Sequence, residues 1–294
     1  MERAKGILYA ALSSSTFGLA PLFTLLLLGL GYSSFEVLSY RWGVASVFLC
    51  ALALLAGRSF RLSWPELRTV FFLSLFRAAT SLSLVIAYQH IASGVASTIH
   101  FMYPLAVALA MMCFFREKGS VWVFAAIGMS IVGAVLLSLG NVDFTRGNTT
   151  LGMVSAAVSV VSYGGYIVGV RKSRAVGIDS TVLTCYVMGL GALYFIAGGL
   201  VTGGIRIETD GTAWLCILGV ALPATAVSNM TLVQAIKRIG PTLTSVFGAL
   251  EPLTAVVIGV AVFGEPFTTQ GAAGILLIVA AVTIVILHSG RRKA

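Results

Sequence analysis

The sequence predicts an all-α integral membrane protein whose ten transmembrane helices form two inverted five-helix repeats around a central cavity. Three observations lead to this prediction. The 294-residue chain is 58% hydrophobic and only 10% charged, whereas a soluble domain carries about 25% charged residues. The second half of the chain repeats features of the first. The basic residues fall into alternate gaps between the apolar runs, as they do in membrane proteins.

The internal repeat is clearest around two prolines, where YPL at 103–105 returns 148 residues later as EPL at 251–253. Other matches at this offset pair Ala87, Ile91, Ser97, Phe115, Glu117, Ala125 and Ile127 with Ala235, Ile239, Ser245, Phe263, Glu265, Ala273 and Ile275. Near the start of each half the offset is 146, and the matches pair Gly6, Ala10, Ala11, Ser13 and Gly18 with Gly152, Ala156, Ala157, Ser159 and Gly164. The repeat predicts two domains, at 1–145 and 146–294. An odd number of spans in each copy inverts the second copy, which is typical of transporters with a binding site between the halves.

Ten apolar stretches approach the length of about 20 residues that a helix needs to cross the hydrocarbon. They are 7–29, 34–56, 67–89, 94–115, 120–140, 150–170, 179–202, 212–234, 241–263 and 268–288. The connections between them are short, so neighbouring spans should run antiparallel, with no room for a separate soluble domain. The first stretch is interrupted by hydroxyl residues and lacks a small-residue cleavage site. We therefore expect a spanning helix there rather than a cleaved signal peptide.

The distribution of Lys and Arg predicts the orientation in the membrane. Of the 19 basic residues, 15 lie in one alternate set of gaps and tails, and only Arg146 and Arg206 lie in the other set. Since basic residues mark the cytoplasmic side, we expect both termini in the cytoplasm. This pattern also accounts for the net charge of +9, which in a soluble protein would suggest nucleic-acid binding.

The sequence predicts no cofactor, no metal and no catalytic group. The four cysteines lie inside apolar runs without paired spacing, and we expect them to be buried residues outside any disulfide or metal site: Cys50, Cys113, Cys185 and Cys216. The chain contains no Walker A loop, metal-spaced His/Cys set, Ser-His-Asp arrangement or nucleotide fingerprint. An ATP-driven pump or a membrane hydrolase is therefore poorly supported.

Two arginines lie inside predicted spans. Arg77 is near the middle of the third span, where an ionisable side chain is costly and indicates a functional site. We expect it to face a water-filled cavity, a partner carboxylate or a substrate anion. The alternatives are a structural arginine bonded to carbonyls and hydroxyls, or a later start of the span that leaves Arg77 near the cytoplasmic surface. Arg41, seven residues into the second span, is expected at the external interface in an ion pair with Glu36.

Glu251 is the acidic residue predicted to lie deepest, directly before Pro252. Three roles are open: a proton-coupling carboxylate, a partner for a cationic substrate group or for Arg77, and an acceptor for a backbone donor freed by the proline. His100 is either a proton relay or a neutral, hydrogen-bonded residue. Pro104 and Pro252 occupy the same place in two spans, and each should kink its helix. We expect these prolines to act as hinges or cavity walls and to face each other across a pseudo-two-fold axis.

Polar and aromatic side chains share faces on several predicted spans. The candidate substrate-binding residues are Ser13, Thr16, Phe17, Arg77, Ser81, His100, Tyr103, Tyr163, Tyr166, Asn229, Ser245 and Glu251. Their mixture of hydroxyls and aromatic rings suits a cavity for a compact, partly apolar solute; ordinary packing is the alternative for the aromatic residues. The fifth and tenth spans carry almost no polar residue in their middles. We expect them to be outer, lipid-facing supports.

The YPL and EPL segments, FFREK at 114–118 and FGEP at 263–266 together resemble the drug/metabolite transporter superfamily, in its EamA-type ten-span branch. The most specific stretch is 249–286, and the resemblance covers essentially the whole chain. It implies an inner-membrane exporter that works by alternating access, driven by a substrate gradient or by proton exchange, with spans 1–4 and 6–9 around the cavity. The segments at 13–23 and 162–173 further resemble bacterial aromatic amino acid exporters of this branch.

For such a substrate, the resemblance implies that four aromatic residues could pack the ring: Phe17, Tyr103, Tyr163 and Tyr166. Arg77, Asn229 or nearby hydroxyls could receive the carboxylate or the amine. The expected partners are thus a small-molecule substrate and the lipid bilayer, without nucleic acid, and the oligomeric state stays open. The alternatives are efflux of other amino acids or of amphipathic cationic drugs, a passive channel, and a membrane-embedded enzyme.

Overall fold

The computed structural model describes residues 2–91, 93–138, 147–254, 257 and 268–290, and no strand occurs among them. In the first half, the five spans are α1 (Glu2–Phe17) with α2 (Ala20–Gly29), α3 (Ser34–Leu55), α4 (Trp64–His90), α5 (Ser93–His100) with α6 (Tyr103–Phe115), and α7 (Val121–Ser138). In the second half they are α8 (Thr149–Lys172), α9 (Ser180–Thr202), α10 (Gly211–Ala221) with η2 (Leu222–Val227) and α11 (Ser228–Ile239), α12 (Pro241–Val246) with η3 (Phe247–Ala249), and α14 (Thr269–Gly290). The short helix η1 (Arg174–Gly177) connects α8 to α9.

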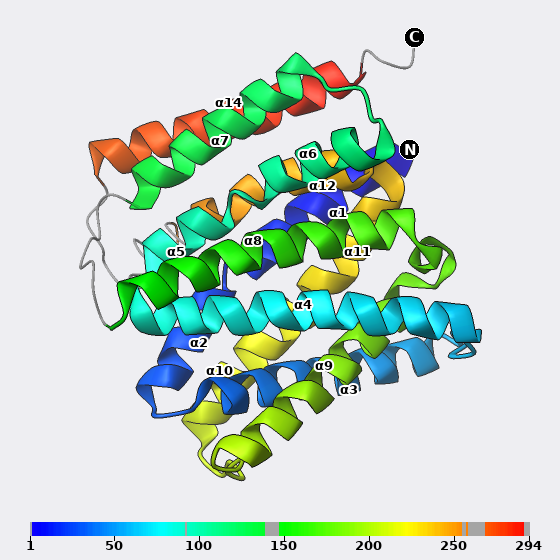
Figure 1. Cartoon of the computed structure of the whole chain (residues 1–294), viewed down its shortest axis with the longest axis vertical. Coiled ribbons are helices and arrows are strands. Elements are labelled where there is room, and N and C mark those ends of the chain that lie inside the picture. Colours follow the sequence, from blue (N-terminus) through cyan, green and yellow to red (C-terminus); the bar gives the residue numbers. More distant parts are fainter. Residues whose placement is uncertain (1, 92, 139–146, 255–256, 258–267, 291–294) are drawn as a thin grey trace.

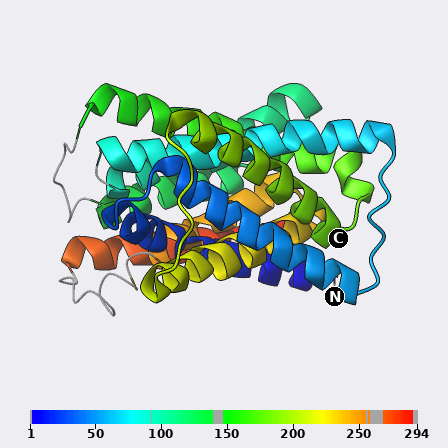
Figure 2. The same ribbon diagram turned by 90° about the horizontal axis from the view of Figure 1, so that it is seen from below.

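The predicted fold class is confirmed. Within the described residues, seven helical segments are long and apolar enough to cross a membrane, and α7 and α14 add shorter apolar helices. Figures 1 and 2 show the helices side by side along a common direction, with the start of α1 and the end of α14 at the same end of the molecule. In Figure 1, α7 and α14 lie together along one edge of the bundle, and α3 and α9 lie towards the opposite edge.

Polar residues in the short connections determine where several spans begin. Ser33 and Glu36 form a capping box at the start of α3, in which the Ser33 amide donates to Glu36 Oε2 at 2.8 Å. The Asp179 carboxylate caps α9 by accepting from the Thr181 amide at 2.9 Å. Asp210 caps α10 in the same way. These caps satisfy amides that the helix itself leaves unpaired.

Several spans are interrupted near their middles. α1 ends at Phe17 before α2 begins, and α5 ends at His100 before α6 begins. Pro21 and Pro104 each occupy the second position of the helix after the interruption, where a missing amide costs no hydrogen bond. In the eighth span, η2 is a π-helical turn that begins at Leu222 and Pro223. Such turns recur at functional sites.

Equivalent contacts in the two halves reveal the internal symmetry. A Cβ atom on Gly6 would lie 2.5 Å from Ile239 Cγ2, so α1 and α11 cross closely there. A Cβ atom on Gly152 would lie 2.7 Å from Ile91 Cγ2. Gly152 follows Gly6 by 146 residues, and Ile239 follows Ile91 by 148. The same glycine–isoleucine packing therefore occurs twice, once with each half supplying the glycine.

Two details differ from the sequence predictions. Cys113 is exposed, and Cys50 is only half-buried although it packs against the main hydrophobic cluster. The eighth span continues to Ile239 instead of ending near residue 234, so Lys237 and Arg238 form its last turn. Basic side chains are favourable there because the carbonyl end of a helix carries partial negative charge.

Candidate functional site

Tyr103 and Glu251 meet at the centre of the molecule. The Tyr103 hydroxyl donates a hydrogen bond to Glu251 Oε1 at 3.1 Å, although the two residues are 148 positions apart. Since this separation equals the repeat offset, two equivalent positions touch each other, and the pseudo-two-fold axis passes between them. A Cβ atom on Gly248 would collide with the Tyr103 hydroxyl. Glycine at position 248 is therefore what allows Tyr103 to approach the second half.

A second pair of equivalent residues, Phe17 and Tyr163, stacks beside this contact. Their ring centroids are 6.3 Å apart with an interplanar angle of 16°, and they are separated by the other repeat offset, 146. Tyr163 also packs against Tyr103 at 4.6 Å and stacks with the His100 ring at 5.3 Å. The aromatic candidates from α1, α6 and α8 thus form one cluster on the axis.

Arg77 lies at the middle of α4 and is only 1% exposed. Its Nε donates to Asn229 Oδ1 at 2.7 Å, and its Nη1 donates to Ser81 Oγ at 3.4 Å. Ser81 and Asn229 are equivalent positions, 148 residues apart, so Arg77 bridges the two halves. Its guanidinium carbon lies 5.0 Å from the centroid of the Tyr163 ring and 5.4 Å from that of Phe17. Such distances allow attraction between the cation and the faces of the rings.

The expected Arg41–Glu36 ion pair is wrong. Arg41 is 4% exposed, its Nε donates to Thr225 Oγ1 at 2.6 Å, and its guanidinium carbon lies 5.8 Å from the Phe17 ring centroid. Glu36 instead pairs with Arg206 at 3.3 Å. Residues five apart in a helix point in different directions, so Glu36 faces the end of the bundle while Arg41 faces its interior. Sequence reasoning missed Arg41 as a central residue, although its position within a span was a usable signal.

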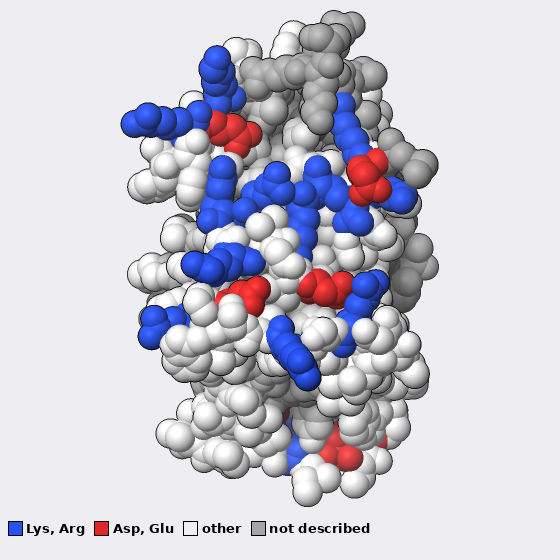
Figure 3. Space-filling model, turned by 90° about the vertical axis from the view of Figure 1, so that its right-hand side faces the viewer, with Lys and Arg blue, Asp and Glu red and all other residues white. Residues whose placement is uncertain are grey.

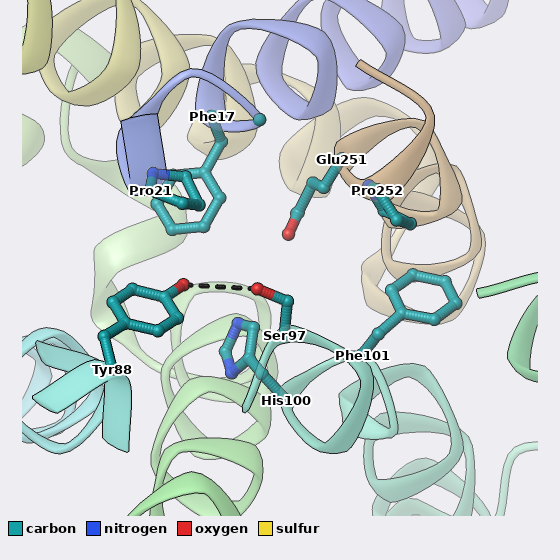
Figure 4. A pocket seen from close by; sticks show the side chains of 9 residues that line it. Phe17, Pro21, Tyr88, Ser97, His100, Phe101, Glu251 and Pro252 are labelled. Atoms are coloured by element: carbon teal, nitrogen blue, oxygen red, sulfur yellow. Dashed lines mark hydrogen bonds between the residues drawn. The ribbon is translucent and has the colours of Figure 1, made fainter. Parts of the chain in front are cut away.

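A small pocket lies between the halves at the Tyr103–Glu251 contact, with a volume of about 40 Å³. Its lining residues are Phe17, Gly18, Pro21, Tyr88, Ser97, His100, Phe101, Glu251 and Pro252. Figure 4 shows Glu251 and His100 pointing into this pocket from opposite sides, next to the hydrogen bond between Tyr88 and Ser97. The volume is enough for a few water molecules.

Some of the other candidate residues contact the central cluster, and others form hydrogen bonds with backbone carbonyls. His100 Nδ1 bonds the Ser159 hydroxyl at 2.8 Å, and Tyr166 is fully buried with its ring centroid 6.0 Å from the Arg77 guanidinium carbon. Three hydroxyls bond backbone carbonyls instead of facing the pocket, those of Ser13, Thr16 and Ser245. Pro104 is buried on α6.

Ion pairs hold equivalent loops at the two ends of the α3–α9 pair. The loop after α9 is held to the start of α3 by the Arg206–Glu36 pair. The loop after α3 is held to the start of α9 by Arg58 and Asp179, at 3.6 Å. Arg206 follows Arg58 by 148 residues. The two halves therefore reach across to each other in the same way at opposite ends of the bundle.

Paired inverted spans around a polar and aromatic cluster on their symmetry axis define a membrane transporter of the inverted-repeat class. A sequence profile described as the EamA-like transporter family matches residues 4–139 and again 150–287. The chain belongs to the EamA-like transporter family, which is part of the drug/metabolite transporter superfamily. The family is one of transporters rather than enzymes.

Similar proteins agree with this assignment. An "Uncharacterized transporter YojE" of Bacillus subtilis (strain 168) is 27% identical over 92% of this chain and 90% of its own length. An "Uncharacterized transporter" of Archaeoglobus fulgidus is 24% identical over 74% of this chain and 76% of its own. A solved structure described only as "Crystal structure of protein" superposes with a TM-score of 0.81 at 19% identity, covering 100% of this chain and 99% of the other. At that identity, the likeness shows the fold alone.

Proposed function

We propose that this protein exports small metabolites across a bacterial inner membrane, and that aromatic amino acids are its main substrates. The observation that carries the proposal is the Arg77 guanidinium beside the stacked rings of Phe17 and Tyr163 on the axis between the halves. A solute with a planar ring and a carboxylate would find aromatic walls and a cation in one place. Asn229 and Ser81, which already bond Arg77, could orient that cation.

Alternating access is the proposed mechanism. The central pocket has room for a few water molecules, so a metabolite could enter only after the halves separate at one end. The equivalent ion pairs at opposite ends of the α3–α9 pair support two gates that open in turn. The helices of the repeats at 1–145 and 146–294 pack in pairs that each join the two halves, so in this proposal helices of both repeats move together, with Pro104 and Pro252 at the hinges.

The proposed orientation places both termini in the cytoplasm. Figure 3 shows Lys and Arg side chains gathered over the end of the molecule where α1 begins. Basic residues collect on the cytoplasmic side of bacterial membrane proteins, which supports the proposal. An alkaline phosphatase fused after α14 should be inactive, because this reporter needs disulfides that form only outside the cytoplasm. An active fusion would show that the C-terminus lies outside the cytoplasm and would contradict the proposed orientation.

The function is tested by counterflow in proteoliposomes that contain the purified protein. Vesicles loaded with unlabelled phenylalanine should transiently accumulate external labelled phenylalanine, and tryptophan should compete. If neither amino acid moves or competes while another amino acid or tetraphenylphosphonium does, the aromatic assignment is wrong. A flux that does not saturate and shows no counterflow would indicate a channel instead of a carrier.

A further inference from the structure

Two buried guanidinium groups lie together at the centre of the molecule, those of Arg41 and Arg77. Arg41 on α3 bonds Thr225, and Arg77 on α4 bonds Asn229. Thr225 and Asn229 are one helical turn apart, and the Asn229 side-chain amide donates to the Thr225 carbonyl at 2.7 Å. Residues at this spacing are neighbours on a helix surface, so they hold the two guanidinium groups side by side. Both guanidinium carbons lie within 6 Å of the Phe17 ring centroid, at 5.8 and 5.4 Å.

The π-helical turn η2 contributes to this arrangement. The Thr225 hydroxyl donates to the Val220 carbonyl five residues earlier, at 2.7 Å, and also accepts from Arg41 Nε. A regular α-helix would place a different residue opposite Arg41, because the extra residue of a π-turn shifts the helix face. The irregular backbone therefore aligns Thr225 with Asn229 under the two arginines.

Neither arginine has a carboxylate partner within the described residues. The ion pairs found there involve other basic residues, and Glu251, the acidic residue at this depth, accepts its hydrogen bond from Tyr103. Glu251 attracts Arg77 electrostatically without forming an ion pair with it. Two neighbouring cations at the middle of membrane spans still exceed this single negative charge, so they are unfavourable unless a further anion joins them.

Several buried hydrogen-bond donors around the two arginines have no acceptor. Arg41 Nη2 is buried and has no hydrogen-bond partner, and neither do Trp42 Nε1 and the Tyr166 hydroxyl. The rings of Trp42 and Tyr166 each have their centroid 6.0 Å from the Arg77 guanidinium carbon. Buried donors are normally satisfied, so this group of donors has the character of a binding site whose acceptor is supplied by a ligand.

We infer that Arg41 and Arg77 together bind the carboxylate of the transported solute, and that this carboxylate is required for recognition. The oxygens would accept from Arg41 Nη2 and its neighbouring donors, while the apolar part of the solute packs against Phe17 and Tyr163. The substrate class is thus carboxylic acids with an apolar or aromatic group, and amphipathic cations are excluded. This inference rests on the proposed function.

The test compares probes that carry one charged group each. Thermal unfolding of the detergent-purified full chain is measured with 3-phenylpropionate, phenethylamine, phenylalaninamide and inorganic phosphate. The carboxylate should raise Tm in a concentration-dependent way, because a ligand that binds only the folded state stabilises it. The two amines and phosphate should leave Tm unchanged. Equal shifts with phenethylamine or phosphate would overturn the inference.

Variants then assign the effect to Arg41. Arg41→Gln should weaken binding of 3-phenylpropionate by roughly tenfold to a hundredfold, the usual effect of losing a hydrogen bond to a charged group. Arg61→Gln, in the exposed loop after α3, is the matched control and should bind like the wild type. Unchanged binding in Arg41→Gln would contradict the inference. If Arg41→Gln fails to fold, the probe series on the wild-type protein still decides.

The inference and the proposed function fail in different ways. Arg41-dependent binding of 3-phenylpropionate without any phenylalanine counterflow would leave the carboxylate site in place and reject aromatic amino acid export. Phenylalanine counterflow that phenethylamine inhibits as well as 3-phenylpropionate does would keep the transport function and reject the carboxylate site.

Discussion

Tyr40 and Tyr186 are equivalent residues of the two halves, and each donates a hydrogen bond to the loop that follows the second span of the other half. The Tyr40 hydroxyl bonds the Arg206 carbonyl at 2.5 Å, and the Tyr186 hydroxyl bonds the Phe60 carbonyl at 2.9 Å. Tyr40 is near the start of α3 and Tyr186 near the start of α9, so the two bonds lie at opposite ends of the bundle. Together with the neighbouring ion pairs, they form one tether at each end.

If these tethers are gates, removing one should loosen only its own end. Tyr40→Phe should increase hydrogen–deuterium exchange in the loop at 203–210 and leave the loop at 56–63 unchanged, and Tyr186→Phe should do the reverse. Each lost hydrogen bond should cost about 1 kcal/mol, or roughly a fivefold change in local opening. Tyr40→Phe should have the larger effect, because the Tyr40 hydroxyl also accepts a hydrogen bond from the Glu208 amide at 3.0 Å. The two variants serve as controls for each other. Loosening of both loops by either single variant would argue against separate gates.

Gly248 should be required for the contact between the halves. Gly248→Ala places a methyl group against the Tyr103 side chain, and overpacking of this kind costs about 1–3 kcal/mol. The expected result is a lower Tm and slower counterflow. The double variant Gly248→Ala/Tyr103→Leu should regain most of the lost stability, because the smaller side chain makes room for the methyl group. A double variant no more stable than Gly248→Ala would mean that some other contact requires the glycine.

Spans, repeats and the depth of Arg77 were readable from the sequence, because apolar run length and internal similarity are properties of the chain itself. The inward direction of Arg41 was not, since it depends on which neighbouring helix covers each face of α3. The sequence also related Tyr103 to Glu251 by the repeat without predicting that they touch. Their contact depends on how closely the two halves pack. Gly248, in the second half, leaves the space that lets Tyr103 of the first half reach Glu251.

Replacing Arg77 with lysine tests whether its planar side chain matters beyond its charge. Arg77 bonds Asn229 and Ser81 through two different nitrogens, and a lysine ammonium cannot reproduce this forked geometry. Arg77→Lys should therefore reach the membrane normally but show at least tenfold slower phenylalanine counterflow. Arg68→Lys, on the first turns of the same helix, is the control and should transport like the wild type. Wild-type counterflow in Arg77→Lys would leave Arg77 as a source of charge alone.

If export is coupled to protons, we expect the coupling to depend on Glu251. Its carboxyl group faces the central pocket (Figure 4) and accepts one hydrogen bond, from Tyr103, so the rest of the group is available to bind a proton or water. Glu251→Gln has the same shape but cannot release a proton. In a proton-coupled exporter, this variant should abolish the stimulation of phenylalanine transport by an imposed pH gradient. It should retain counterflow, which needs no net proton movement.

Tyr103→Phe is the matched control, because it removes the hydrogen bond without removing the carboxyl group. This variant should still respond to the gradient. A Glu251→Gln variant as responsive as the wild type would exclude this residue as the coupling site, and a wild type that ignores the gradient would show that the solute gradient alone drives export.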